Sequence, residues 1–185
     1  MKVEQTKIEG LLIIHPTVFG DDRGWFMESF NQQQFTNAFL ELGLNVPKFV
    51  QDNHSLSQKG VLRGLHYQNA PHAQGKLVRV VQGKAWDVAV DIRKDSKTYG
   101  HWVGIELSAQ NKTILWIPEG FAHGFIALED NTQFLYKATN YYNKESEGAI
   151  LWNDPNLAIE WPLENIAEVL VSDKDKIADV FHLLK

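Results

Sequence analysis

Apolar and polar residues alternate along several short stretches of the chain, and turn signals separate these stretches. In residues 86–92 every second side chain is large and apolar, from Trp86 to Ile92. A period of two is typical of a β-strand. Further short strands are predicted at residues 10–14, 102–107, 114–117, 125–127 and 134–138. Many short strands with frequent turns favour a sandwich or barrel over a parallel α/β sheet.

One helix is predicted ahead of this β-rich region, over about residues 31–42. Phe35, Phe39 and Leu42 recur there at helical spacing. Asn31 can cap the start of such a helix, and the glycine that follows Leu42 can end it.

A single domain is predicted for residues 1–185, because the length suits one hydrophobic core and no linker, repeat or low-complexity tract divides the chain. The barrel core is expected at about residues 46–142. The tail, about residues 163–185, is predicted to form short helices packed outside it. These patterns predict a mainly β fold with a few short peripheral helices.

Composition narrows the classes of function. Hydrophobic residues make up 44% and charged residues 22%, which is ordinary for a globular protein. The net charge of −5 gives no sign of a nucleic-acid partner. No apolar run approaches the roughly 18 residues of a membrane span, and the N-terminus lacks the apolar stretch of a signal peptide. The absence of cysteine excludes disulfides and thiolate chemistry. A cytoplasmic protein with no membrane partner is expected.

Amides and titratable side chains gather among β-formers and glycines in residues 49–55, 60–68 and 74–76. The mixture contains Arg63, His66 and Lys76. Packing alone does not require these residues together. A site that binds an anion and moves a proton does, because arginine and lysine bind anionic groups and histidine titrates near neutral pH.

The spacing of this region resembles that of the cupins, a jelly-roll family known by two motifs. Residues 60–83 fit the first motif, but Gln68 stands where the family has its second metal-binding histidine and Lys76 where it has a glutamate. Residues 118–123, Pro-Glu-Gly-Phe-Ala-His, fit the second. The resemblance implies a cupin-like jelly-roll β-barrel or sandwich.

No metal is expected in this frame. Metal sites use neutral imidazoles and carboxylates, whereas the ammonium of Lys76 repels a cation. His72 is a candidate to replace the lost ligand, but it falls in a predicted loop. What remains is a base, His66, beside a cation. Such a pair suits proton abstraction next to a ketone, since imidazole can take the proton and an ammonium can stabilise the enolate. Tyr136, on a predicted strand, could return a proton from the opposite face.

The chain also resembles the dTDP-4-dehydrorhamnose 3,5-epimerase family in ordered blocks over nearly its whole length. The blocks are residues 18–24, 49–68, 74–79, 116–125, 136–142, 150–154 and 172–175. The resemblance implies a cofactor-independent epimerase. Its substrate would be dTDP-4-dehydro-6-deoxy-D-glucose, and it would invert C3 and C5 next to the C4 ketone in dTDP-L-rhamnose biosynthesis.

The resemblance further implies roles for individual residues. His66 matches the proton acceptor, Tyr136 the proton donor, and Lys76 the lysine near the keto oxygen. Asp175 matches the carboxylate that pairs with the histidine, and Asp87 remains a second candidate for that pairing. Contacts with the nucleotide and the rest of the substrate are implied for Phe19, Arg23, Phe26, Glu28, Gln51, Asp52, Asn53, Arg63, His123, Tyr142, Glu147 and Lys174.

In this family the segment around residues 23–28 reaches into the site of a neighbouring subunit, so the resemblance implies a homodimer. Several alternatives stay open. An enzyme of the same family could invert only C3 or only C5. A related 3,4-ketoisomerase, a non-catalytic cupin that binds a sugar nucleotide and a metal-dependent cupin dioxygenase are the others.

Overall fold

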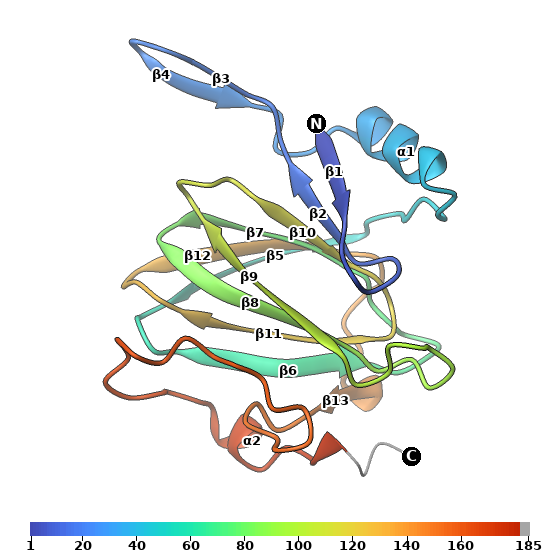
Figure 1. The fold of residues 1–185 in the computed structure, drawn as a ribbon, viewed down its shortest axis with the longest axis vertical. Helices are drawn as coiled ribbons and strands as arrows, with labels where there is room; N and C mark the ends of the chain where they lie inside the picture. The colour runs from blue at the N-terminus through green and yellow to red at the C-terminus, as the bar shows by residue number, and fades with distance from the viewer. Residues whose placement is uncertain (182–185) are drawn as a thin grey trace.

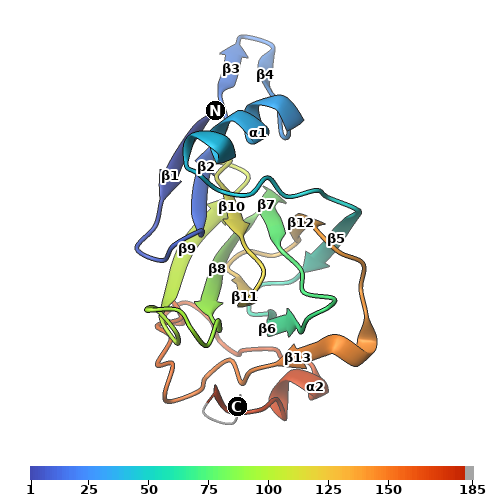
Figure 2. The ribbon, with the colours of Figure 1, turned by 90° about the vertical axis from the view of Figure 1, so that its right-hand side faces the viewer.

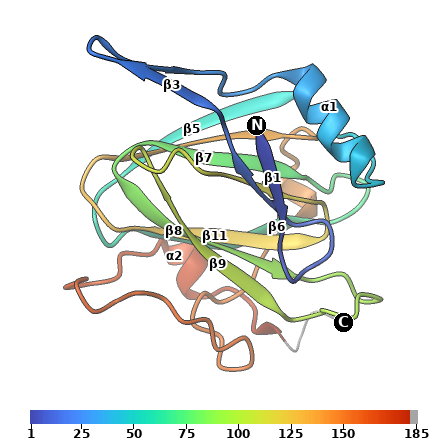
Figure 3. The ribbon, with the colours of Figure 1, turned by 45° about the horizontal axis from the view of Figure 1, so that its top comes forward.

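Two antiparallel β-sheets lie face to face in the protein, whose computed structural model describes residues 1–181 (Figure 1). One sheet has six strands in the order β1-β2-β10-β7-β12-β5, and the other has five in the order β13-β6-β11-β8-β9. A two-stranded hairpin, β3–β4, projects from one end of the molecule (Figure 3). The protein is therefore a mainly β sandwich, which confirms the predicted fold class.

The elements are short. The six-stranded sheet contains β1 (Lys2–Gln5), β2 (Leu12–His15), β10 (Ile114–Ile117), β7 (Lys76–Gln82), β12 (Thr132–Ala138) and β5 (Gln51–Ser57). The five-stranded sheet contains β13 (Glu147–Ala149), β6 (Leu62–Gln68), β11 (Phe121–Ala127), β8 (Lys84–Asp91) and β9 (Trp102–Ser108). The remaining elements are β3 (Val18–Asp21), β4 (Gly24–Met27), α1 (Gln32–Glu41), the 3₁₀ turn η1 (Lys144–Ser146) and α2 (Asp173–Lys176). Within residues 1–181, no helix has the length and apolar character needed to cross a membrane.

The strands predicted from alternation are present, with shifted ends. Those predicted at residues 86–92, 102–107, 114–117 and 134–138 correspond to β8, β9, β10 and β12. The one predicted at residues 10–14 corresponds to β2. The one predicted at residues 125–127 is only the end of β11, which begins at Phe121 because its ladder with β8 already starts there.

The alternation along β8 separates two different environments. Val88 and Val90 pack outward, in a cluster with the C-terminal segment that covers the five-stranded sheet. Ala85 and Ala89 face the space between the sheets, where they belong to the central core. Within that core the rings of Phe125 and Phe134 stack with their centroids 4.1 Å apart. Both faces of β8 are therefore covered by other parts of the protein. Polar side chains on its inward face can contact side chains of the opposite sheet.

Helix α1 covers the outer face of the six-stranded sheet, near β10 and β7 (Figure 2). The side chain of Asn31 caps it by accepting a hydrogen bond from the backbone N–H of Gln34 at 3.1 Å. Phe35 and Phe39 are buried, and the ring of Phe39 meets that of Trp116 edge-on at 5.5 Å. The predicted helix, its cap and its buried face are confirmed.

The prediction of a helical tail is largely wrong. Of the tail, α2 forms one helical turn, while residues 163–171 have no helix. The backbone of Leu170 instead exchanges hydrogen bonds with Gly60 and Leu62, at 2.9 Å each, beside the start of β6. Tertiary pairing therefore satisfies the polar groups that a helix would have used. The segment does pack outside the five-stranded sheet, as predicted, and residues 182–185 of the predicted tail lie outside the described residues.

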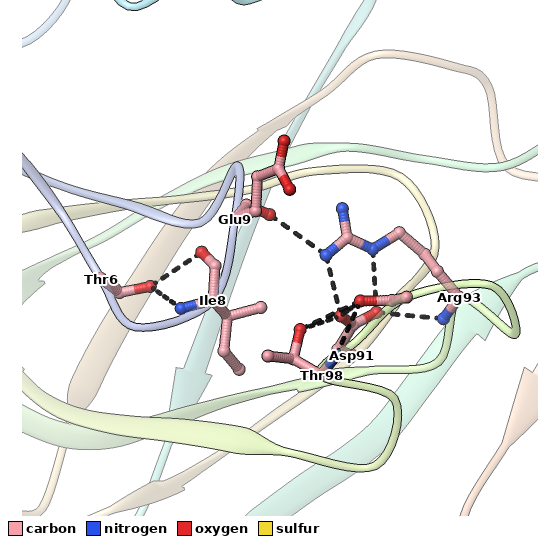
Figure 4. Close-up of polar contacts among 7 residues, drawn as sticks. Thr6, Ile8, Glu9, Asp91, Arg93 and Thr98 are labelled. Atoms are coloured by element: carbon pink, nitrogen blue, oxygen red, sulfur yellow. Dashed lines mark hydrogen bonds and ion pairs between the residues drawn. The ribbon is translucent and has the colours of Figure 1, made fainter.

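A network around a buried carboxylate at the end of β8 joins the loop between β8 and β9 to the loop between β1 and β2 (Figure 4). Asp91 accepts two hydrogen bonds from the guanidinium of Arg93 at 2.8 Å, and others from the hydroxyls of Ser96 and Thr98 at 2.6 and 2.7 Å. Arg93 also donates to the backbone carbonyl of Glu9 at 3.1 Å. Burial alone would raise the pKa of Asp91, but these hydrogen bonds outweigh it and lower the pKa to about 2.

This network predicts an acid-sensitive contribution to stability. Asp91→Asn is expected to lower the free energy of unfolding at pH 7 by about 3 kcal/mol, because it leaves Arg93 without its ionic partner. The folded-state pKa is depressed, so the wild-type protein holds this contribution above the ordinary pKa of 3.8 and loses it as the pH falls toward about 2. Urea unfolding between pH 7 and pH 2 measures both effects. The exposed Asp95→Asn is the control, and equal stabilities of the two variants would contradict the prediction.

Candidate active site

A cavity of about 450 Å³ opens between the two sheets, at the side covered by the C-terminal segment. Strands β6 and β11 of one sheet and β7, β12 and β5 of the other supply its walls, and the turn α2 closes one side. The cavity brings together all four predicted catalytic residues and several predicted substrate contacts. Its predicted members are Asn53, Arg63, His66, Lys76, His123, Tyr136, Lys174 and Asp175.

His66, on β6, forms a hydrogen bond with Asp175 on α2, with 2.6 Å between Nε2 and Oδ1. The side chain of Ser172 caps α2 by accepting from the backbone N–H of Asp175, so the turn holds the carboxylate in place. Asp175 is only 2% exposed. Burial opposes ionisation, yet hydrogen bonds from His66, Ser172 and the backbone of Gly64 prevail and lower the pKa of Asp175. The carboxylate is therefore ionised and orients the imidazole.

The two candidate carboxylates have separate partners. Asp175 pairs with His66, while Asp87 on β8 pairs with His123 on β11, with 2.8 Å between Nε2 and Oδ2. The two histidines lie directly opposite each other in the β6–β11 ladder. Desolvation lowers the pKa of His123 although Asp87 opposes this, so His123 is neutral at pH 7. His66, His123 and Asp175 line the cavity, whereas Asp87 is fully buried behind His123.

Lys76 enters the cavity from the first position of β7, in the opposite sheet from His66. Its side chain is partly accessible from the cavity, but protein surrounds the ammonium. The resulting desolvation lowers the pKa of Lys76 to about 8, against the opposing charges of Asp87 and Glu147. Its Nζ lies 6.0 Å from the ring centroid of Tyr136. The ammonium of Lys76 therefore lies near Tyr136, the predicted proton donor.

Tyr136 lies on β12, also in the six-stranded sheet, and faces the cavity. Burial raises the pKa of its phenol, although the charge of Arg63 opposes this. The phenol is therefore protonated at neutral pH and is able to donate. Because His66 belongs to the other sheet, the predicted base and the predicted acid occupy opposite walls of one cavity.

A second group of predicted contacts lies around the mouth of the cavity. Arg63 donates to the hydroxyl of Ser57 at 3.1 Å and to the carbonyl of Leu56 at 3.3 Å, which holds an otherwise exposed guanidinium. The amide of Gln51 donates to Oδ1 of Asn53 at 3.0 Å. The buried Nδ2 of Asn53 has no hydrogen-bond partner within residues 1–181.

Three predicted contacts form a chain next to α2. The phenol of Tyr142 donates to Glu147 at 3.0 Å, and Glu147 forms an ion pair with Lys174. Burial acts to raise the pKa of Glu147, but Lys174 and Tyr142 outweigh it and the pKa is lowered. Lys174 directly precedes Asp175, the partner of His66. This series of contacts therefore connects the exposed ring of Tyr142 with α2.

The remaining predicted contacts do not reach this cavity. Asp52 points to the opposite face of β5 and pairs with Lys137 at 3.0 Å. Phe19, Arg23 and Phe26 lie on the projecting hairpin, where all three are exposed (Figure 3). Glu28 accepts hydrogen bonds from Asn31 and Gln34 beside α1. Within one chain, the hairpin residues therefore lie away from this cavity.

Gln68, at the position of a metal-binding histidine in the cupin motif, has a structural role here. Gln68 donates to the carbonyls of His72 and Tyr141 and accepts from the backbone N–H of Asn143 at 2.8 Å. It thereby joins two loops beside the cavity. This anchoring and the capping by Ser172 were not foreseen from the sequence. For the anchoring by Gln68, the only signal in the sequence was the glutamine in place of a histidine in the cupin motif. In residues 1–181 no cluster of three or more His, Asp or Glu residues could hold a metal ion.

An imidazole and a phenol on facing walls, with an ammonium beside them, suit an acid–base isomerase in a cupin-like sandwich. The sequence model of the dTDP-4-dehydrorhamnose 3,5-epimerase family matches residues 5–182. A dTDP-4-dehydrorhamnose 3,5-epimerase from Shigella flexneri is 60% identical over 175 residues, which cover 95% of this chain and 93% of the relative.

Solved structures agree in fold. One is the dTDP-6-deoxy-D-glucose-3,5-epimerase of Legionella pneumophila in complex with dTDP-4-keto-L-rhamnose, which is 50% identical in sequence and superposes with a TM-score of 0.92. The match covers 100% of this chain and 94% of the Legionella chain. A 3'-monoepimerase of Streptomyces bikiniensis in complex with dTDP-quinovose has a TM-score of 0.85 and 33% identity, over 95% of this chain and 85% of its own. The chain belongs to the dTDP-4-dehydrorhamnose 3,5-epimerase family, which confirms the predicted family and class of enzyme.

Proposed function

We propose that the protein converts dTDP-4-dehydro-6-deoxy-D-glucose to dTDP-4-dehydro-L-rhamnose by inverting C3 and C5, as a step of dTDP-L-rhamnose biosynthesis. One observation carries the proposal. His66 and Tyr136 face a single cavity from opposite sheets, as an inversion at carbon requires. The names of the relatives support the substrate, since the Legionella pneumophila structure contains dTDP-4-keto-L-rhamnose.

His66 is the proposed base. Its Nε2 is engaged by Asp175, so the ring carries its proton there and leaves the lone pair of Nδ1 free. That nitrogen takes the proton from the carbon next to the ketone, and the ionised carboxylate stabilises the imidazolium that forms. The pair is preorganised, because α2 and its serine cap hold Asp175 before any substrate arrives.

Lys76 and Tyr136 complete the proposed reaction. Removal of the proton leaves an enolate with negative charge on oxygen, which the ammonium of Lys76 stabilises in a site largely shielded from water. The phenol of Tyr136 then donates a proton to the opposite face of the same carbon. One base and one acid serve both carbons in turn.

The groups at the cavity mouth bind the nucleotide half of the substrate in this account. The guanidinium of Arg63 pairs with diphosphate oxygens through parallel hydrogen bonds. Asn53 lines the same cavity, and the exposed ring of Tyr142 stacks on the base. Binding energy gained there positions the sugar between His66 and Tyr136.

The product of the reaction tests the proposal. Incubation with dTDP-4-dehydro-6-deoxy-D-glucose is expected to give a product inverted at both C3 and C5 by NMR. A product inverted at one carbon supports the second candidate, a single-carbon epimerase. The likeness to the 3'-monoepimerase of Streptomyces bikiniensis is the observation that favours this candidate. Binding without any turnover would contradict both and leave a sugar-nucleotide-binding protein.

We also propose a cytoplasmic homodimer in which the hairpin of each protomer completes the site of its partner. The exposed side chains of Phe19, Arg23 and Phe26 support this, because isolated domains rarely leave large aromatic residues on a projecting hairpin without a partner. Arg23 would supply charge for the diphosphate and the two rings an apolar contact for the nucleotide.

Mixing two inactive variants tests this arrangement. Arg23→Ala and His66→Asn each damage every site of their own homodimer. A heterodimer of the two contains one intact site, so an equal mixture is expected to recover about a quarter of wild-type activity after subunit exchange. A mixture no more active than the sum of its components would exclude sharing across the interface.

A further inference from the structure

Glutamine side chains hold the loop that carries Tyr142. Residues 139–143 connect β12 to η1 without forming a helix or a strand. Backbone N–H and C=O groups in such a segment need partners from elsewhere in the protein. Glutamines outside the loop supply four of these hydrogen bonds, one at each of residues 140–143. The conformation of the loop therefore depends on side chains that are not part of it.

Two of these glutamines lie on the side of the six-stranded sheet. Gln51 begins β5, and its Oε1 accepts a hydrogen bond from the backbone N–H of Tyr142 at 3.1 Å. Gln74 precedes β7, and its Nε2 donates to the carbonyl of Asn140 at 2.7 Å. Gln51 is also a predicted substrate contact, so its replacement would change the loop and the cavity together.

The third glutamine, Gln68, makes three bonds from the end of β6 in the other sheet. Its Nε2 donates to the carbonyls of His72 and Tyr141, and its Oε1 accepts from the backbone N–H of Asn143 at 2.8 Å. The side chain is buried, with 8% exposed. An amide has two N–H donors and an acceptor oxygen, whereas a neutral imidazole has one donor and one acceptor. A histidine at this position could not make the three bonds separately.

We propose that Gln68 is a positioning residue for nucleotide binding, which holds the loop so that the ring of Tyr142 meets the base of the substrate. The inference rests on the proposed function, in which this ring stacks on the base. The ring is 57% exposed, so packing holds it only weakly, and the backbone bonds of the loop set its place. Gln68 does not itself line the cavity, so it acts through the loop.

The physical effect is a saving of conformational entropy on binding. A loop without anchors would have to become ordered when the nucleotide binds, and that cost would lower the affinity. With residues 140–143 already bonded, the ring of Tyr142 is in place before the substrate arrives. Loss of the anchor should therefore weaken nucleotide binding and leave the proton transfers at His66 and Tyr136 largely intact.

Gln68→Met tests this inference, because methionine has a similar length but no amide. The Kd for dTDP, measured by isothermal titration calorimetry, is expected to rise about tenfold. The KM for the sugar nucleotide should rise with it, while kcat stays within about twofold of the wild type. Gln58→Met is the matched control. The amide of Gln58 also bridges two loops, since it donates to the side chain of Asn131 at 3.2 Å and accepts from its backbone N–H at 3.3 Å. Because Asn131 belongs to the turn before β12, this variant should leave the Kd unchanged.

A double-mutant cycle with Tyr142→Ala identifies how Gln68 acts. In the Tyr142→Ala background, Gln68→Met is expected to change the Kd for dTDP by less than about twofold, because the ring that the loop positions is gone. An unchanged Kd in the single variant Gln68→Met overturns the proposal, as does an equal loss in both backgrounds. Should Gln68→Met not fold, Gln74→Met removes one bond to the same loop, and a rise of about threefold that again requires Tyr142 is expected.

The cycle also separates this inference from the proposed function. Coupling between Gln68 and Tyr142 in a protein that binds dTDP but inverts neither carbon supports the inference and contradicts the proposed reaction. If Tyr142→Ala itself binds dTDP as tightly as the wild type, the ring does not stack on the base, and the inference is overturned together with that contact.

Discussion

His66→Asn is expected to lower kcat by roughly 10³-fold or more, because the side chain then has no nitrogen that can accept a proton from carbon. In the account given above, every turnover begins with that transfer, at C3 as at C5. The amide of asparagine can still donate to Asp175, so the buried carboxylate keeps a partner and the fold is retained. The loss should appear in kcat with little change in substrate affinity, measured by steady-state kinetics and by binding of dTDP.

His54→Asn is the matched control for this variant. His54 lines the cavity from β5 with an exposed side chain, and its ring binds Gln133 at 2.9 Å rather than a carboxylate. Its replacement should leave kcat within about twofold of the wild type, as surface substitutions away from the chemistry usually do. An active His66→Asn protein, with more than a tenth of wild-type kcat, would remove His66 from the role of base.

Tyr136→Phe is expected to separate proton abstraction from inversion. Inversion should fall by roughly 10²- to 10³-fold, since the donor on the six-stranded sheet is lost. His66 still removes the proton and returns one to the same face, so recovered substrate should carry solvent deuterium without inversion. The variant keeps the ring that packs near Lys76 and loses one hydroxyl, so stability should change little. Mass spectrometry and NMR of recovered substrate in D₂O measure the two rates separately.

The control for Tyr136→Phe is Tyr141→Phe, which removes a hydroxyl from an exposed tyrosine outside the cavity. It should preserve both rates. If Tyr136→Phe lowers exchange and inversion by the same factor, Tyr136 does not act after the abstraction step. If it lowers neither, another group donates the proton.

The sheet architecture was largely predictable from local pattern. The alternation in residues 86–92 identified β8, and the spacing of Phe35 and Phe39 identified α1. The pattern could not decide which row of β8 faces the cavity, because both faces of this strand are covered. Only the packed structure reveals that the polar row, with Asp87, points inward.

The prediction of a helical tail was wrong because the structure of this segment depends on long-range pairing, which the local sequence does not reveal. Residues 163–171 carry enough apolar side chains for a helix, but Leu170 pairs with the backbone around Gly60, more than a hundred positions away along the chain. Such pairing overrides helix propensity, which is a weak preference for any single residue. The short helix α2 does form, and the side chain of Ser172 caps its start.

The site shows the same division. Motif spacing and family resemblance named His66, Lys76, Tyr136 and Asp175 as a group, and one cavity brings all four together. Spacing could not choose between Asp175 and Asp87, since both carboxylates lie near a histidine in the folded chain. The substrate contacts of hairpin residues such as Arg23 stay predictions, because within one chain these residues do not line the cavity.

Deuterium incorporation tests the central claim most directly. The protein is incubated with dTDP-4-dehydro-6-deoxy-D-glucose in D₂O, and the product is analysed by NMR at C3 and C5, with His66→Asn in parallel. We expect deuterium and inverted configuration at both carbons with the wild-type protein, and neither with the variant. A folded wild-type protein that binds the substrate but incorporates no deuterium at either carbon would contradict the account.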